Sequence, residues 1–188
     1  VAFDLLAIDI GSTPATISVP GAAEYAIAAK PVSQFLAQWN QLVQQVAQAP
    51  QEPVRLGIVG GGAGGVELAL AMQSRLHQVL LARYNLEIHL FHGDAELMPN
   101  YNSWVRRRFK EILTARGVVL HLQERVCEVQ PHKVKCESGL KVECVSVAAP
   151  KELRIFWITQ ASAPTWLRSA GLATDSNGFI QVRDTLQS

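Results

Sequence analysis

The sequence predicts an α/β domain in which helices cover a parallel β-sheet and a three-stranded antiparallel meander is inserted. Two observations predict the sheet. Apolar strand-like runs alternate with helical patterns between residues 54 and 122, and a glycine-rich loop separates the first such strand from its helix. A third observation predicts the meander, because residues 124–148 hold three short strand-like runs joined by connections of hairpin length.

The first fifty residues open on an apolar run, FDLLAID at 3–9, which predicts a buried strand ended by turn residues. Residues 12–31 carry turn signals and no regular period, so we expect irregular structure there. Ser33 is a suitable N-cap for a helix over 34–48, whose apolar residues recur at helical spacing. The stretch AQAPQEP, with its two prolines, then forms a linker.

The central part predicts three strands and two helices in strict alternation. The strands are expected at 54–60, 86–92 and 118–122, and the helices at about 64–83 and 101–116. The strands are apolar almost throughout, which is typical of parallel strands buried on both faces.

The pattern changes after the third strand. The runs ERVCEVQ, KVKCES and LKVECVSVA are separated by Pro131-His132 and Ser138-Gly139, so they predict the meander. ELRIFWIT at 152–159 is apolar again and predicts a further parallel strand. A short helix near 164–169 and a turn at 176–178 follow.

The composition is that of an ordinary folded domain, with 188 residues, 48% hydrophobic, 18% charged and a formal net charge of +1. This charge favours neither a nucleic-acid partner nor an anionic membrane, and no apolar run reaches the length of a membrane span. Cys127, Cys136 and Cys144 contain no CxxC pair, so we expect free thiols, no metal site and a cytoplasmic protein. The chain starts inside an apolar run, so we expect a piece of a longer protein.

The glycine-rich loop predicts a binding site for a dinucleotide pyrophosphate. In the pattern Gly60-x-Gly62-x-x-Gly65, the first glycine permits the tight turn, the second lets the phosphates approach and the third lets helix and strand pack closely. The loop, with Ala63, and the predicted helix start at Gly64 would present backbone N–H groups at the positive end of the helix dipole. The alternative is a glycine-rich turn with no ligand.

The residue at the end of the second strand does not settle which coenzyme binds. An acidic residue there binds the adenosine ribose of NAD, and a basic one accommodates the 2′-phosphate of NADP, but this chain has His92. A neutral imidazole can hydrogen-bond a hydroxyl and a protonated one can meet a phosphate; the alternative is a histidine facing water. His89 lies three residues earlier, on the opposite face of the strand, which argues against a metal site made by these two histidines.

These motifs resemble the FAD-dependent pyridine nucleotide-disulfide oxidoreductases, in the branch of type II NADH dehydrogenases. The resemblance rests on VRLGIVGGGAGGVELALAM, on FWITQASAPTWLRSAGLATDSNGFIQVRDTLQS, on FDLLAIDIGSTP and on VPGAAEYAIAAKPVSQFLAQW. It is strongest to the flavoprotein module fused ahead of selenide, water dikinase. The family implies a three-layer, Rossmann-like FAD/NAD(P)-binding domain, with NAD(P)H and FAD as cofactors. It also places Glu67 and Thr159 toward the nicotinamide.

The resemblance also implies a division of the chain. Residues 1–50 would lead from a flavin domain, 51–160 would bind NAD(P)H, and 161–188 would return toward the flavin domain. The sequence holds one glycine fingerprint where such enzymes have two, so we expect a domain that passes hydride to a flavin held elsewhere and is inactive alone.

Two departures from the family pattern weaken the NAD(P)H assignment, and they indicate either an altered coenzyme preference or decayed nucleotide binding. Gln160 follows Thr159 where relatives have glycine, and His92 replaces the ribose-binding acid. The alternative is a non-catalytic module with a degenerate nucleotide site, serving interaction or regulation beside a fused kinase domain. The sequence leaves the electron acceptor and the choice of NAD or NADP open.

The third helix carries a basic run at Arg106, Arg107, Arg108 and Lys110. It predicts a solvated helix face rather than a phosphate or partner site, because Trp104 and its apolar neighbours are expected to face the core. No nucleophile elbow and no P-loop occur in the sequence, so no catalytic residue is assigned.

Overall fold

A computed structural model describes residues 4–11, 13–14, 19–81, 85–144, 155–159, 161–185 and 187–188. The chain divides into two compact units, and each is described here by itself. The larger unit is Pro14–Gln160, and the smaller combines Val1–Thr13 with Ala161–Ser188.

The larger unit is built on a five-stranded sheet in which every neighbouring pair is parallel. Its strands, in spatial order, are β2 (Ile27–Ala28), β9 (Ile155–Trp157), β3 (Val54–Val59), β4 (Leu86–His92) and β5 (Val119–Leu122). The expected parallel strand at 152–159 is confirmed at Ile155–Trp157 and ends two residues earlier than predicted, while residues 152–154 lie outside the described chain. β2 adds a strand where the sequence predicted irregular structure, since two residues are too few to show a period.

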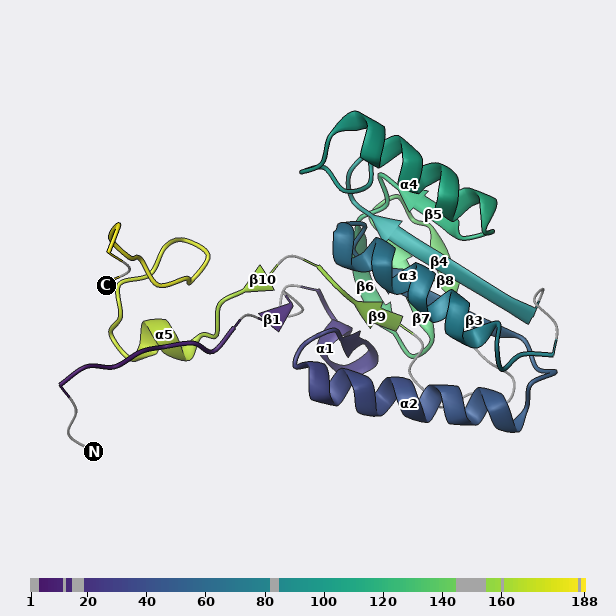
Figure 1. The fold of residues 1–188 in the computed structure, drawn as a ribbon, viewed down its shortest axis with the longest axis horizontal. Coiled ribbons are helices and arrows are strands. Elements are labelled where there is room, and N and C mark those ends of the chain that lie inside the picture. Colours follow the sequence, from purple (N-terminus) through teal and green to yellow (C-terminus); the bar gives the residue numbers. More distant parts are fainter. Residues whose placement is uncertain are drawn as a thin grey trace. The chain divides into compact units, whose positions relative to one another are not determined.

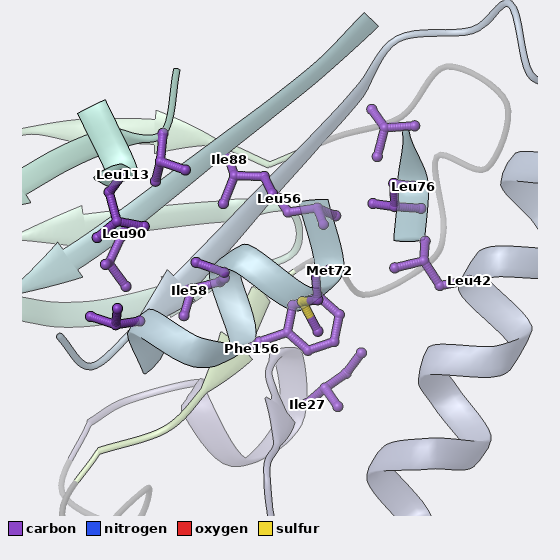
Figure 2. Packing of buried hydrophobic residues seen from close by; sticks show 14 of the residues in the cluster. Ile27, Leu42, Leu56, Ile58, Met72, Leu76, Ile88, Leu90, Leu113 and Phe156 are labelled. Carbon is purple, nitrogen blue, oxygen red and sulfur yellow. The ribbon is translucent and has the colours of Figure 1, made fainter. Parts of the chain in front are cut away.

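Three helices cover one face of this sheet (Figure 1): α2 (Val32–Gln48), α3 (Ala63–Leu76) and α4 (Ser103–Ala115). Ile58, Leu90 and Phe156 from three adjacent strands meet Met72 of α3 and Leu113 of α4 in one buried cluster (Figure 2). Burial of these side chains holds the helices against the sheet.

Three helices differ from their predicted bounds. α2 begins at Val32 with Pro31 as its N-cap, so the prediction of a helix from 34 with Ser33 as N-cap is wrong at that end. The first crossover helix ends at Leu76 instead of about 83, because the chain turns through His77–Val79 and the Leu81 amide donates to Pro50 O in the linker. α4 begins later than residue 101, because the Asn102 side chain caps it by accepting from the Val105 amide at 2.9 Å.

The meander covers the other face of the sheet, which gives three layers. It consists of β6 (Val126–Gln130), β7 (Lys133–Cys136) and β8 (Lys141–Glu143), paired antiparallel in that order. Its apolar residues pack with Phe91 and Trp157 and with the short helix α1 (Ala22–Tyr25) in a second core. The predicted α/β fold and its meander are therefore confirmed; residues 145–148 lie outside the described chain.

The smaller unit is mostly irregular. It contains the short helix α5 (Trp166–Ser169), as expected, and β10 (Ala161–Ser162), which pairs with β1 (Thr13–Pro14). The Asp175 carboxylate accepts from the amides of Asn177 and Phe179 and fixes the predicted turn. The expected buried strand at 3–9 is wrong over its described residues 4–9, where Leu5 is 87% exposed, because no strand of the described chain pairs with it.

Candidate functional site: the glycine loop at the edge of the sheet

The loop between β3 and α3 begins with a turn that only glycine fits. Gly60 has a φ of +123°, and its amide donates to Phe91 O of β4 at 2.9 Å. A Cβ at Gly60 would overlap the Ile158 carbonyl group and lie 2.7 Å from its carbon. The loop therefore packs closely between the carboxyl ends of β4 and β9, which only a glycine at position 60 permits.

Gly65 serves the contact between helix and strand. A Cβ there would overlap the Gly60 carbonyl oxygen and lie 2.9 Å from its carbon, so α3 approaches the loop as closely as backbone allows. The next residue, Val66, donates to Gly62 O at 3.1 Å and closes the first helical turn. The third glycine of the pattern is thus required by packing.

Gly62 differs from both, because among the described residues no atom beyond its chain neighbours lies within 4 Å of where its Cβ would be. It is the N-cap of α3, with ordinary φ and ψ values of −73° and −177°, and no acidic residue lies in the first turn. The N–H groups of the first helical residues, Ala63 and Gly64 among them, have no intrahelical acceptor. The open side of the loop therefore combines free donors with the positive end of the helix dipole.

His92, at the end of β4, turns toward this loop. Its Nδ1 accepts from the Gly61 amide at 3.3 Å, and the ring packs against Gly61, with its side chain only 13% exposed. Its Nε2 lies 3.5 Å from Asp94 Oδ2, without the alignment of a hydrogen bond. The histidine is thus largely shielded from water, and it supports the glycine loop.

Two more predicted site residues belong to the described chain, one after β9 and one on α3. Thr159 follows β9, accepts a hydrogen bond from Trp157 Nε1 at 2.8 Å and lies next to the Gly60 turn. Glu67 is exposed on the second turn of α3. Gln160 lies outside the described residues.

Sequence reasoning missed Arg125, which follows β5. The segment that carries it crosses the end of β4, because the Gln123 amide donates to Asp94 O and the Glu124 amide to His92 O, at 3.0 and 2.9 Å. This places the Arg125 guanidinium against Gly93. No periodicity or motif marks an arginine in a connection, so the sequence offered no signal for it.

A histidine pair on the meander side of the sheet was also missed. His89 Nδ1 lies 2.8 Å from His121 Nε2 on β5, so one of the two nitrogens donates to the other. Glu87 Oε1 lies 3.3 Å from His89 Nε2, and Arg55 pairs with Glu87. Burial lowers the pKa of His89 to about 4 and also lowers the pKa of His121. Both rings are therefore neutral at pH 7.

Neither histidines nor cysteines provide a metal centre in the described part of the chain, where no group of three or more His, Cys, Asp or Glu side chains can hold an ion. Cys127, Cys136 and Cys144 are free, as expected. Burial raises the pKa of the Cys136 and Cys144 thiols to about 12, so neither is a nucleophile at neutral pH.

The basic run on α4 lines a pocket of about 380 Å³ beside the connection from β4. Arg106 pairs with Glu96 at 2.6 Å, and Arg108 with Glu111 at 3.4 Å. Trp104 is 64% exposed, so the expectation that it faces the core is wrong; Val105 and Phe109 pack inward instead. The helix turns its basic side and one indole to solvent.

Comparison with known proteins identifies the family and the fold. The family described as pyridine nucleotide-disulphide oxidoreductase matches residues 1–188. The chain is 22% identical over 187 residues to demethylphylloquinone reductase NdbB from a Synechocystis species, covering 100% of this chain but 43% of that protein. It thus spans less than half the length of that relative.

Two solved structures share the fold at low sequence identity. NDH2 from Plasmodium falciparum, in complex with NADH, superposes with a TM-score of 0.70 and 13% identity, covering 92% of this chain and 38% of that one. An engineered water-forming NADPH oxidase bound to NADPH gives 0.67 and 19%, covering 93% and 34%. Among the described residues, no helix is long and apolar enough to cross a bilayer.

Proposed function

Because the chain belongs to the pyridine nucleotide-disulphide oxidoreductase family, we propose that it is the NAD(P)H-binding part of a flavin-dependent oxidoreductase. The family named from the sequence and its cofactors, NAD(P)H and FAD, are confirmed at the level of the family. In such a protein NAD(P)H supplies a hydride and the flavin accepts it. The task of these residues is to hold the dinucleotide in a fixed orientation.

One observation supports this proposal above the others: the open N-terminus of α3 at Gly62. Helix N–H groups and the helix dipole suit a doubly negative pyrophosphate, and the packing at Gly60 and Gly65 fixes them in position before any ligand binds. A preorganised site loses less entropy on binding than a flexible loop.

The finer assignments are part of the same proposal. Residues 51–160 bind the coenzyme, 1–50 lead from a flavin domain and 161–188 return toward it. Glu67, Thr159 and Gln160 lie toward the nicotinamide end. The fused selenide, water dikinase domain rests on sequence resemblance alone, and the cytoplasmic location is supported by the three free cysteines.

A second candidate function is a non-catalytic module that keeps the fold for interaction or regulation. His92 favours this candidate for two reasons. Its ring accepts a hydrogen bond from the Gly61 amide, and a histidine at the last residue of β4 provides no carboxylate to bind a ribose hydroxyl. Such a module would bind both coenzymes weakly or not at all.

Titration of the chain with NADH and with NADPH by calorimetry separates the two candidates. We expect saturable binding of at least one coenzyme, and we expect Gly62→Arg to abolish it. The substitution should leave the fold intact, because φ is ordinary and the space is open. Gln44→Arg on the exposed side of α2 adds the same charge away from the loop and is the matched control.

Far-UV circular dichroism and a thermal melt check that both variants are folded. Saturable binding that survives Gly62→Arg would place the ligand elsewhere and overturn the proposed site. No binding of either coenzyme to the folded wild-type chain would favour the non-catalytic module.

A further inference from the structure

We propose that Arg125 binds the 2′-phosphate of the coenzyme and that the chain therefore prefers NADPH to NADH. This inference rests on the proposed function, and it names the residue and the chemical group that decide between the two coenzymes.

The position of the adenosine follows from the loop. With the pyrophosphate at the N-terminus of α3, the adenosine ribose of a dinucleotide lies over the carboxyl end of the next strand, here β4. Two hydrogen bonds hold the glycine loop against β4 and the connection that follows it. The Gly60 amide donates to Phe91 O and the Met98 amide donates to Gly61 O, each at 2.9 Å. The residues directly after β4 therefore flank the ribose.

No carboxylate stands at the last residue of β4. The His92 ring turns to the Gly61 amide and is largely buried. The nearest acid, Asp94, has an oxygen 3.5 Å from His92 Nε2. A free ribose 2′-hydroxyl, which NADH presents, finds no acceptor at the usual strand-end position, so this end of the sheet lacks the feature that favours NADH.

A cation occupies the neighbouring position instead. Atoms Nη2, Cζ and Nε of Arg125 lie 3.4, 3.5 and 3.6 Å from where a Cβ on Gly93 would be. The guanidinium therefore lies beside Gly93, the first residue beyond β4. A guanidinium has the fork geometry that matches two phosphate oxygens.

The backbone of Arg125 is fixed by hydrogen bonds, while its side chain is exposed and can contact a ligand. Its carbonyl accepts from the Glu137 amide at 2.9 Å, which adds to the two hydrogen bonds that fix residues 123 and 124 to the end of β4. The side chain is exposed, and among the described residues no carboxylate forms an ion pair with it. The adjacent Glu124 carboxylate accepts from Ser138 at 2.6 Å.

The test compares two ligand pairs by calorimetry: NADPH with NADH, and adenosine 2′,5′-bisphosphate with adenosine 5′-phosphate. For the wild-type chain we expect the 2′-phosphorylated member of each pair to bind at least about tenfold more tightly. Arg125→Gln should remove that preference, lowering NADPH affinity about 10–100-fold and NADH affinity less than about twofold. Arg125→Glu should favour NADH.

Arg107→Gln is the matched control, because it removes one exposed cation from the pocket on α4 and leaves the end of β4 unchanged. Loss of the preference in Arg107→Gln but not in Arg125→Gln would overturn the proposal and assign the phosphate to that pocket. Equal saturable binding of NADH and NADPH would also overturn it, while leaving the proposed function intact. Failure of both coenzymes to bind would overturn the proposed function itself.

Discussion

At the scale of single residues, the three glycines of the GxGxxG pattern differ in what the fold requires of them. Gly60 requires a positive φ, Gly65 requires the absence of a Cβ, and Gly62 requires neither. Of these three, Gly62 has no structural reason to be glycine, and it is the one that faces the proposed pyrophosphate. In the proposed function, Gly60 and Gly65 would build the site and Gly62 would admit the ligand.

Replacing Gly65 by alanine should therefore destabilise the fold strongly. Its Cβ would overlap the Gly60 carbonyl, where backbone meets backbone and no side chain can move aside. We expect a loss of at least about 3 kcal/mol in the free energy of unfolding, measured with denaturant. Gly64→Ala is the matched control, because its Cβ would meet only the Ile158 side chain at 3.4 Å, and it should change stability by less than about 1 kcal/mol. Equal effects of the two substitutions would contradict the packing role of Gly65.

The sequence predicted the roles of Gly60 and Gly65 correctly, because a strand, a glycine pattern and a helix in immediate succession permit few backbone paths. It could not predict where the side chain of His92 points. That direction depends on the Gly61 amide, which becomes an available donor only when the loop folds against β4. The contact of Arg125 with Gly93 joins residues 32 positions apart and is likewise invisible in a linear pattern.

At the scale of elements, alternating strands and helices were predictable because each has a strong hydrophobic period. The failures have local causes. Residues 4–9 are apolar enough for a strand, but a strand also needs a neighbour. The first crossover helix was predicted too long, since Leu80 is buried in the same core after the helix has ended. Burial thus continued the apolar pattern past the end of the hydrogen-bonded helix.

The histidine pair depends on the register between two strands, which the sequence does not show. His121 lies opposite Phe91 in the ladder, and its ring reaches diagonally to His89. The groups that face this pair are Glu87 on β4 itself, Arg55 on the neighbouring strand β3 and Glu124 after β5. The pair bridges β4 and β5, so protonating it affects how the edge strand is held.

This pair predicts a loss of stability in mild acid. Burial lowers the pKa of His89 from 6.5 to about 4, so the unfolded chain takes up a proton more readily than the folded one. The stabilisation is complete above about pH 6.5 and is lost as the pH falls toward 4, by up to about 3 kcal/mol. Denaturant unfolding at several pH values should show this fall, and His89→Gln, which stays neutral, should flatten it. Parallel pH profiles for the two proteins would rule out the histidine as the cause.

At the scale of the whole molecule, the proposed reaction needs two sites and the sequence holds the fingerprint of one. The chain covers 43% of the length of the Synechocystis relative that it matches along its entire length. A hydride donor and its acceptor must be held in contact for transfer. In the proposed function, the described fold would orient the donor, and the acceptor site would lie in other residues of the same protein.

The 188-residue chain, purified alone, should accordingly bind coenzyme without oxidising it. We expect no flavin absorbance near 450 nm, since the only glycine fingerprint in the sequence is the one proposed for NAD(P)H. We also expect no consumption of NADPH when FAD is added in solution. A longer protein that includes a second glycine fingerprint should retain FAD and be reduced by the same coenzyme, and Gly62→Arg in that protein should abolish reduction while leaving the flavin bound. Stoichiometric flavin in the short chain would show that these residues hold both cofactors, and the division of labour proposed between the two domains would then fail.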